Sequence, residues 1–531
     1  MIQHRMERQA YLKPRTVHWS WLGPFLYMAV VSLYFVYRYA GRWAEADSTT
    51  FATVIRPFVE EGRLLPVGGA VYPNGYAYQA ISTYILALTG LDVATLQQLI
   101  YPFVAVMVVL PAWVLYRELI GSPRGATLTT LLLFTQPEFL FVILRSSHEK
   151  FTRTLMLLCL FFLVRSLRLR DRPWALAVHV GLFYLAAFGF IASNNLLAHS
   201  FIFAIASALA LGWLLAKRSA SLQWQSRGAL HRFTYATLIC LGLVYVFTFY
   251  IYPPAQHDLI ILKSIGDRIA ALFLDVQSQT TNAYAQVEAG WIAPAPYVYF
   301  MVSIANWIIL VTSFVIWLRQ GFNWLWRGKP PKTQPAWLLW LFYAAFAIQG
   351  ALSVVADASG ALASNLQHRL FPSFSIIAVA LVGAALAQWR PRRFARAVRL
   401  GLTVSIACVA ILSVFKATNE PLLSNKWTFY RSAELDAIVW SDSHLRDAEI
   451  WTEFDERLIV AFFTEKGGSP YGNHLQGGLR PDGRDIVLTT LTRLRSSRLG
   501  LPLPVPPDAF RVYDNGEAEL YHLRPQTQFQ R

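Results

Sequence analysis

The chain has 531 residues, of which 55% are hydrophobic and only 15% are charged. Soluble globular proteins carry about a quarter charged residues, so this composition excludes an ordinary soluble domain and places most of the chain in a bilayer. The formal net charge of +16 could indicate a nucleic-acid partner. Because the basic residues lie in the loops between apolar segments, they indicate membrane topology and exclude a nucleic-acid surface.

About eleven apolar segments are close to 20 residues long, the length that a helix needs to cross a bilayer. A further apolar stretch, 77–91, is too short to cross and is expected to form a helix at the membrane surface. The first span is long and lacks a small-residue cleavage site, so no cleavable signal peptide is expected. The predicted spans are 20–39, 98–116, 126–144, 152–168, 174–192, 196–216, 233–252, 296–318, 336–356, 370–389 and 398–416.

Basic residues mark every second loop of this pattern. Arg5 and Arg8 precede the first span, Arg165 and Arg168 end the fourth, and Arg392 precedes the last. Positively charged loops stay in the cytoplasm, so the N-terminus is predicted to be cytoplasmic. With an odd number of spans, the C-terminus of this multi-pass cell-membrane protein lies on the extracytoplasmic side.

Three extracytoplasmic segments are long enough to fold. The first external loop, 42–97, contains the short surface helix, and a later loop contains an amphipathic stretch, Leu259–Phe273. Residues 418–531 have the composition of a soluble protein, with short predicted strands and a helix. The predicted fold is therefore an α-helical polytopic membrane domain, 1–417, followed by a small extracytoplasmic α/β domain.

Two carboxylates, Glu45 and Asp47, lie just beyond the first span, at the beginning of the first external loop. Carboxylates at the edge of a bilayer are costly to desolvate, so they usually contact water, a metal ion or a substrate. The alternative is an ordinary solvated loop.

The second external loop is unusually charged for its length. Three basic residues, Arg145, Lys150 and Arg153, flank His148 and Glu149. The positive-inside pattern disfavours cations on this side, so we expect a compensating partner. An anionic ligand, a metal ion held by His148 and Glu149, or the acidic pair of the first loop could each fill that role. Alternatively, the long basic side chains extend to the membrane interface.

A third cluster lies at the external start of the tenth predicted span, where His368 and Arg369 head a helix that enters the lipid. A guanidinium at this place can bind a phosphate through two hydrogen bonds, and a helix N-terminus also favours anions. The two residues are therefore candidates for substrate binding. The alternative is an arginine that anchors the span among the lipid headgroups.

Together, the acid after the first span, the long first loop with surface helices, the charged second loop, the basic residue before a late span and the C-terminal extracytoplasmic domain resemble the GT-C superfamily of integral membrane glycosyltransferases. This superfamily includes protein O-mannosyltransferases, aminoarabinose transferases and oligosaccharyltransferases. The local motifs that carry the resemblance are Glu45–Asp47, Arg145–Lys150 and Gln367–Pro372.

The resemblance implies transfer of a sugar from a polyprenyl-phosphate or polyprenyl-diphosphate donor at the outer membrane face. Asp47 occupies the position of the first-loop acid, which acts as a base or binds a divalent cation, Mg or Mn. His148 and Glu149 stand where the family has an Asp-containing metal-ligating pair. The Trp-Trp-Asp-Tyr-Gly motif of oligosaccharyltransferases is absent, and Trp440-Ser441-Asp442 does not replace it. Protein N-glycosylation is therefore not expected, and the acceptor remains open among glycan, lipid and protein.

The chemistry of the residues agrees with this expectation. Glycosyl transfer from a lipid phosphate needs a base near the acceptor hydroxyl and positive charge on the departing phosphate. Asp47, with Glu45 beside it, can supply the first, and Arg145, Lys150 and Arg369 can supply the second. Two rival classes share the many spans and the basic outer loops: a transporter of lipid-linked sugars, and a polysaccharide polymerase or ligase.

Overall fold

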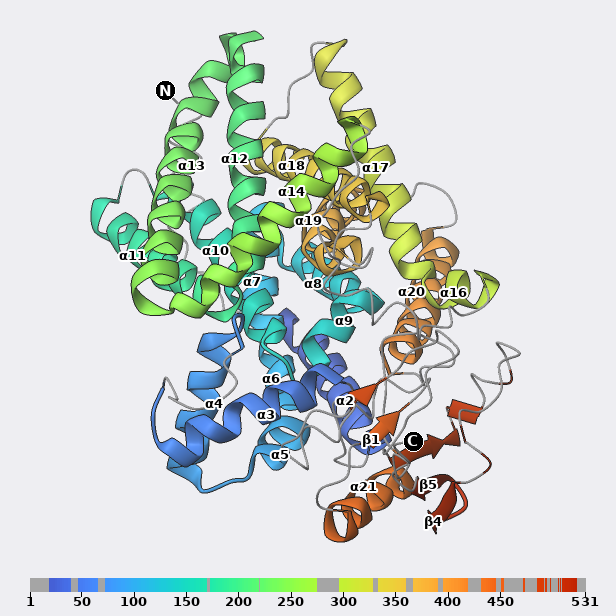
Figure 1. Ribbon diagram of the computed structural model, residues 1–531. Helices are drawn as coiled ribbons and strands as arrows, with labels where there is room; N and C mark the ends of the chain where they lie inside the picture. Colours follow the sequence, from blue (N-terminus) through green and yellow to red (C-terminus); the bar gives the residue numbers. More distant parts are fainter. Residues whose placement is uncertain are drawn as a thin grey trace.

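The computed structural model describes most of the membrane part of the chain and pieces of the C-terminal segment. The described residues are 19–39, 46–64, 72–169, 172–218, 220–274, 296–327, 333–359, 366–389, 395–418, 431–445, 450–452, 471–472, 485–490, 492–493, 497, 505, 507 and 509–522. They form a bundle of long helices with a smaller α/β unit at one end (Figure 1).

Nine helical segments of the described chain are long and apolar enough to cross a membrane, as expected of a multi-pass membrane protein. Each overlaps a predicted span, although the span expected at 296–318 begins only at Ile304, after the short helix α16 (Pro296–Val302). The segments are Trp19–Tyr39 (with α2, Leu22–Tyr39), Val93–Ile120 (with α5, Val93–Thr95, α6, Tyr101–Met107, and α7, Val109–Ile120), Pro173–Ser193 (α11), Asn195–Ala216 (in α12, Asn195–Arg218), Leu230–Ile251 (with most of α13, Ala220–Val246), Ile304–Trp324 (in α17, Ile304–Leu325), Pro335–Ala358 (in α18, Gln334–Ala358), Leu366–Gln388 (α19) and Leu400–Thr418 (in α20, Ala395–Thr418).

The span predicted at 126–144 is broken into α8 (Pro123–Phe134) and α9 (Pro137–Leu144), which meet at an angle of 78°. Pro137 explains the break, because a proline disfavours helical geometry in the residue before it, and Gln136 is extended. Every residue of α9 is buried. At its start, the carboxylate of Glu138 lies 2.7 Å from the Lys416 ammonium at the end of α20.

Helix α10 (Glu149–Arg168) contains the span predicted at 152–168, but it carries five charged residues and is therefore not among the nine apolar segments. At its far end, Arg165 and Arg168 pair with Glu118 of α7 at 2.9 and 3.1 Å. The described chain thus has nine apolar spans, or ten with the broken one, against about eleven predicted. The charge of α10 accounts for the difference.

Close helix contacts hold the bundle together. A Cβ atom added to Gly383 of α19 would overlap the side chain of Thr129 on α8, so the missing side chain lets these two helices approach closely. Tyr39 at the end of α2 donates a hydrogen bond of 2.7 Å to the Thr418 carbonyl at the end of α20. The first and the last spans therefore meet at one end of the bundle.

The helices predicted outside the spans are present. The first loop forms α3 (Ala46–Glu61) and α4 (Tyr76–Thr89), which matches the apolar stretch expected at 77–91. The predicted amphipathic stretch lies within α14 (His257–Leu274), with Leu259 and Ile260 exposed.

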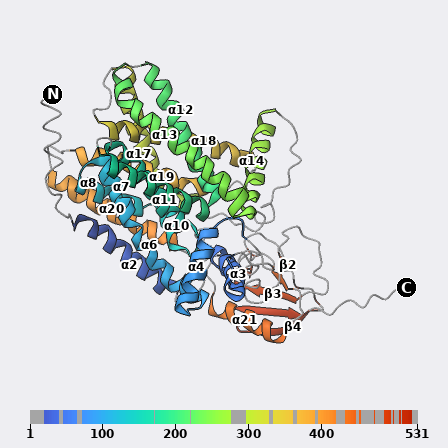
Figure 2. The ribbon, with the colours of Figure 1, turned by 90° about the vertical axis from the view of Figure 1, so that its left-hand side faces the viewer.

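The C-terminal unit combines α21 (Ser432–His444) with a mixed sheet. Its described strands are β1 (Ile450–Thr452), β2 (Tyr471–Gly472), β3 (Asp485–Thr489), β4 (Phe510–Asp514) and β5 (Ala518–His522), in the order β2-β1-β3-β5-β4. Strand β1 is parallel to β2 and β3, and β5 is antiparallel to β3 and β4. Ala52 of α3 packs into the core of this unit, so α3 lies between it and the bundle (Figure 2). The expected α/β composition is confirmed, whereas a domain boundary at 417/418 stays a prediction.

Candidate functional site

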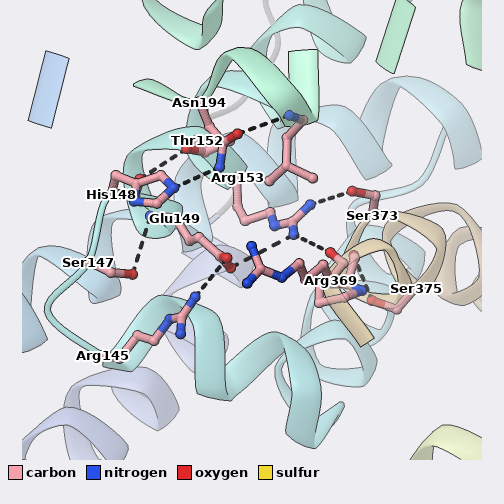
Figure 3. Close-up of polar contacts among 12 residues, drawn as sticks. Arg145, Ser147, His148, Glu149, Thr152, Arg153, Asn194, Arg369, Ser373 and Ser375 are labelled. Carbon is pink, nitrogen blue, oxygen red and sulfur yellow. Dashed lines mark hydrogen bonds and ion pairs between the residues drawn. The ribbon is translucent and has the colours of Figure 1, made fainter. Parts of the chain in front are cut away.

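The turn between α9 and α10 brings a buried carboxylate and several guanidinium groups together (Figure 3). Glu149, the first residue of α10, lies 2.7 Å from the guanidinium of Arg145 and 3.9 Å from that of Arg153. Residues four apart share a helix face, so Arg153 reaches back toward Glu149 along α10. Both arginines are buried, and Arg153 is 0% exposed.

Arg153 joins this turn to the start of α19. Its guanidinium donates hydrogen bonds to the Arg369 carbonyl, at 2.9 Å, and to the Ser373 hydroxyl. The side chain of Arg369 lies near enough for its charge to act on the Glu149 carboxylate. Three guanidinium groups from two helices and one turn thus surround one carboxylate. We call these four residues the guanidinium cluster.

His148 lies beside the guanidinium cluster and is fixed from two sides. Its Nε2 is 2.7 Å from the side-chain amide nitrogen of Asn194. On the other side lies Gly75, at φ +82°, where an added Cβ would be 3.2 Å from the Cβ of His148. The ring of Phe51 in α3 is 4.9 Å from the imidazole. The first loop therefore packs directly on the second.

The other predicted site residues lie in different surroundings. Lys150 donates a hydrogen bond of 2.8 Å to the Tyr101 carbonyl on α6 and lies 5.3 Å over the Tyr101 ring. His368 is half-buried in the first turn of α19, next to Arg369. Glu45 and the side chain of Asp47 lie outside the described residues, although the backbone of Asp47 is the second residue of α3.

The predicted metal site receives little support from the geometry. Among the described residues, no three His, Cys, Asp or Glu side chains are grouped closely enough to hold a metal ion. Glu149 is paired with Arg145, and the Nε2 atom of His148 is in contact with the side-chain amide nitrogen of Asn194. A carboxylate surrounded by guanidinium groups is a poor ligand for a cation. The described part of the cluster fits an anion better than a divalent cation.

Sequence reasoning missed Asn194, the partner of His148, and the role of one member of the guanidinium cluster. Asn194 follows a long apolar run and has no periodic neighbour that would mark it as functional. Arg153 was named among the three second-loop cations that need a partner, but not as a fully buried residue that joins two helices. An arginine one turn inside an apolar helix is the signal that could have identified it, because an ionised group at such a place needs a partner.

Comparison with known proteins gives a match to solved structures only. No protein-family model matches the sequence, and no curated protein does. The apo crystal structure of the Archaeoglobus fulgidus oligosaccharyltransferase superposes with a TM-score of 0.53 at 12% identity, over 92% of this chain and 69% of that one. The chain has a GT-C-like fold. The fold resemblance predicted from the sequence is thereby confirmed.

Two further structures are also similar to this chain. Archaeal oligosaccharyltransferase AglB from Archaeoglobus fulgidus, in complex with an inhibitory peptide and a dolichol-phosphate, has a TM-score of 0.49 at 12% identity, over 91% of this chain and 69% of that one. ArnT from Cupriavidus metallidurans, in the apo state, has a TM-score of 0.43 at 13% identity, over 94% of this chain and 97% of that one.

Proposed function

We propose that this protein is a membrane glycosyltransferase that moves a sugar from a polyprenyl-phosphate-linked donor to an acceptor on the extracytoplasmic side. The observation that carries the proposal is the guanidinium cluster, at the end of the bundle where α3 packs on the second loop. The GT-C-like fold supports the same class of reaction.

The charge of the guanidinium cluster suits a departing phosphate. Three guanidinium groups against one carboxylate leave an excess of positive charge at the site drawn in Figure 3. Glu149 pairs with Arg145, and Arg153 donates to the Arg369 carbonyl, so the backbone that carries the half-buried Arg369 is held at the start of α19. Oriented donors of this kind stabilise charge that develops on a leaving group.

The acid of the first loop completes the proposed mechanism. Asp47 and Phe51 are four residues apart and share a face of α3, and Phe51 contacts His148. Asp47 takes the proton of the acceptor hydroxyl, whose oxygen forms a new bond to the anomeric carbon of the sugar. The bond from that carbon to the phosphate oxygen breaks, and its electron pair leaves with the phosphate. Glu45 is the second acidic candidate at this position.

In an alternative form of the proposal, Asp47 binds a divalent cation, Mg or Mn, instead of acting as the base. His148 and Glu149 would then be further ligands of this ion. Such an ion would supply positive charge for the phosphate, which the guanidinium cluster also supplies. The acceptor class stays open, and Lys150 and His368 stay candidates for substrate binding.

The broken span α8–α9 favours one second candidate, a transporter of lipid-linked sugars, because discontinuous helices are typical of transporter binding sites. The complete burial of α9 in protein and its end at Arg145 fit an enzyme scaffold equally well. The two classes differ in whether the glycosidic bond to the lipid is broken.

The test is a transfer assay on the purified protein with a short-chain polyprenyl-phosphate sugar. We expect Arg369→Ala to weaken donor binding at least tenfold, and Arg369→Lys to restore it only partly, because lysine lacks the two-pronged contact. Arg327→Ala, at an exposed arginine after α17, is the matched control and should leave affinity unchanged. Intact donor after long incubation with the wild type and a range of acceptors would contradict the proposal and favour transport.

A further inference from the structure

Asp258 is a buried carboxylate outside the guanidinium cluster. It lies in the first turn of α14 and is 0% exposed, although the residues directly before and after it, His257 and Leu259, are exposed. One oxygen accepts a hydrogen bond of 2.9 Å from the side-chain amide of Asn74, in the first loop. The other oxygen, Oδ2, accepts no hydrogen bond from the described residues.

A second contact strengthens the same connection. Tyr252, shortly before α14, donates a hydrogen bond of 2.7 Å to the carbonyl of Tyr72. Tyr72 and Asn74 belong to one turn, which continues into Gly75 and α4. The segment that starts α14 therefore holds this turn at two points.

Asp258 also faces the start of α12. The side chain of Asn195 lies near enough to the Asp258 carboxylate to lower its pKa, and its amide donates to the Thr248 hydroxyl at 3.4 Å. Asn74 directly precedes Gly75, and Asn195 directly follows Asn194, the partner of the His148 ring. Gly75 and Asn194 lie on the two sides of His148, so both neighbours of Asp258 are next in sequence to residues that flank this ring.

Burial makes this carboxylate expensive to keep charged. It raises the pKa of Asp258 to about 6, although Asn74, Asn195 and His257 act in the opposite direction. A buried carboxylate with one firm hydrogen bond contributes little net stability, and its role is better sought in the geometry that it fixes.

We infer that Asp258 is a positioning residue that holds the Tyr72–Gly75 turn of the first loop and the start of α12 against opposite sides of His148. It thereby sets the separation between α3, which carries Asp47, and the guanidinium cluster. The inference rests on the proposed function for its kinetic test, but the arrangement itself can be measured without turnover.

The first test measures hydrogen exchange in peptides that contain Tyr72–Gly75 and Ser146–Glu149. Asp258→Ala removes the acceptor of the Asn74 hydrogen bond and the carboxylate near Asn195, and it should speed exchange in these peptides about tenfold or more. Asp258→Asn should preserve wild-type exchange, because its carbonyl still accepts from Asn74. Asp267→Ala removes an exposed carboxylate from the same helix and is the matched control. Should Asp258→Ala fail to fold, Asn74→Ala removes the same bond from the other side, with the same expected exchange.

The second test is kinetic. Asp258→Ala should lower kcat on the order of a hundredfold with little change in the KM for the donor. The reason is that the distance between α3 and the guanidinium cluster changes, whereas the groups that bind the donor phosphate do not. Asp258→Asn should restore kcat. Unchanged exchange in the turn, or an equal loss of kcat in the Asn and Ala variants, would overturn the inference. A wild type with no transfer activity would instead refute the proposed function and leave the exchange result to decide on Asp258.

Discussion

Replacing Asp258 by asparagine should make the protein more stable above neutral pH. The ordinary carboxyl pKa of 3.8 is raised to about 6 in the folded protein, so folding binds a proton between these values. Because the folded state holds this proton more tightly than the unfolded chain, stability falls as pH rises from about 4 to about 6 and stays lower above that. A pKa difference of about two units lowers the free energy of unfolding by about 3 kcal/mol once the pH is well above 6.

Asparagine at position 258 has nearly the same side-chain shape as aspartate and does not ionise. Its carbonyl can accept the hydrogen bond from Asn74, as the carboxylate does. The melting temperatures of wild type and Asp258→Asn in detergent should therefore be nearly equal at about pH 4. The variant should gain an increasing advantage up to about pH 7 and a constant one above.

The difference in melting temperature between the two proteins at each pH removes the contribution of every group that titrates in both. A difference that does not change with pH, or a wild type that is the more stable protein at about pH 8, would refute the reasoning from burial. Either result would mean that the carboxylate has a compensating partner when it is charged.

Two further predictions concern the mechanism and the orientation. Asp47→Asn should lower turnover by about a hundredfold to ten-thousandfold while the melting temperature holds, and Glu45→Gln should lower it less. EDTA then separates the roles of Asp47, because loss of activity indicates a metal ligand and retention indicates a base. In intact cells, an impermeant thiol reagent should label Ser443→Cys on the exposed side of α21 but not Gln320→Cys at the end of α17. The reverse pattern would invert the topology and place Asp47 in the cytoplasm.

The spans and surface helices could be predicted from the sequence because a bilayer imposes length and apolarity on each segment separately. Helix α14 is an example, since its amphipathic period is a local property of the chain. The break at Gln136 was missed, although Pro137 was visible, because membrane helices often tolerate proline when neighbouring groups satisfy the backbone.

The candidate site was predictable in part for a similar reason. Arg145, Glu149 and Arg369 were recognisable because charges near a membrane are costly wherever they occur, and the structure brings them together. The contacts of Asn194 and Asp258 could not be recognised from the sequence, because each depends on a partner far away along the chain. Only the folded arrangement reveals such pairs.

The ion pair between Glu138 and Lys416 has a consequence for biosynthesis. The ribosome reaches Lys416 about 280 residues after Glu138, which at about 5–20 residues per second is a delay of roughly 15 to 60 seconds. During that interval, Glu138 lacks the Lys416 ammonium. A nascent chain that stops before Lys416 would contain every arginine of the guanidinium cluster and still lack this ion pair at the other end of α9.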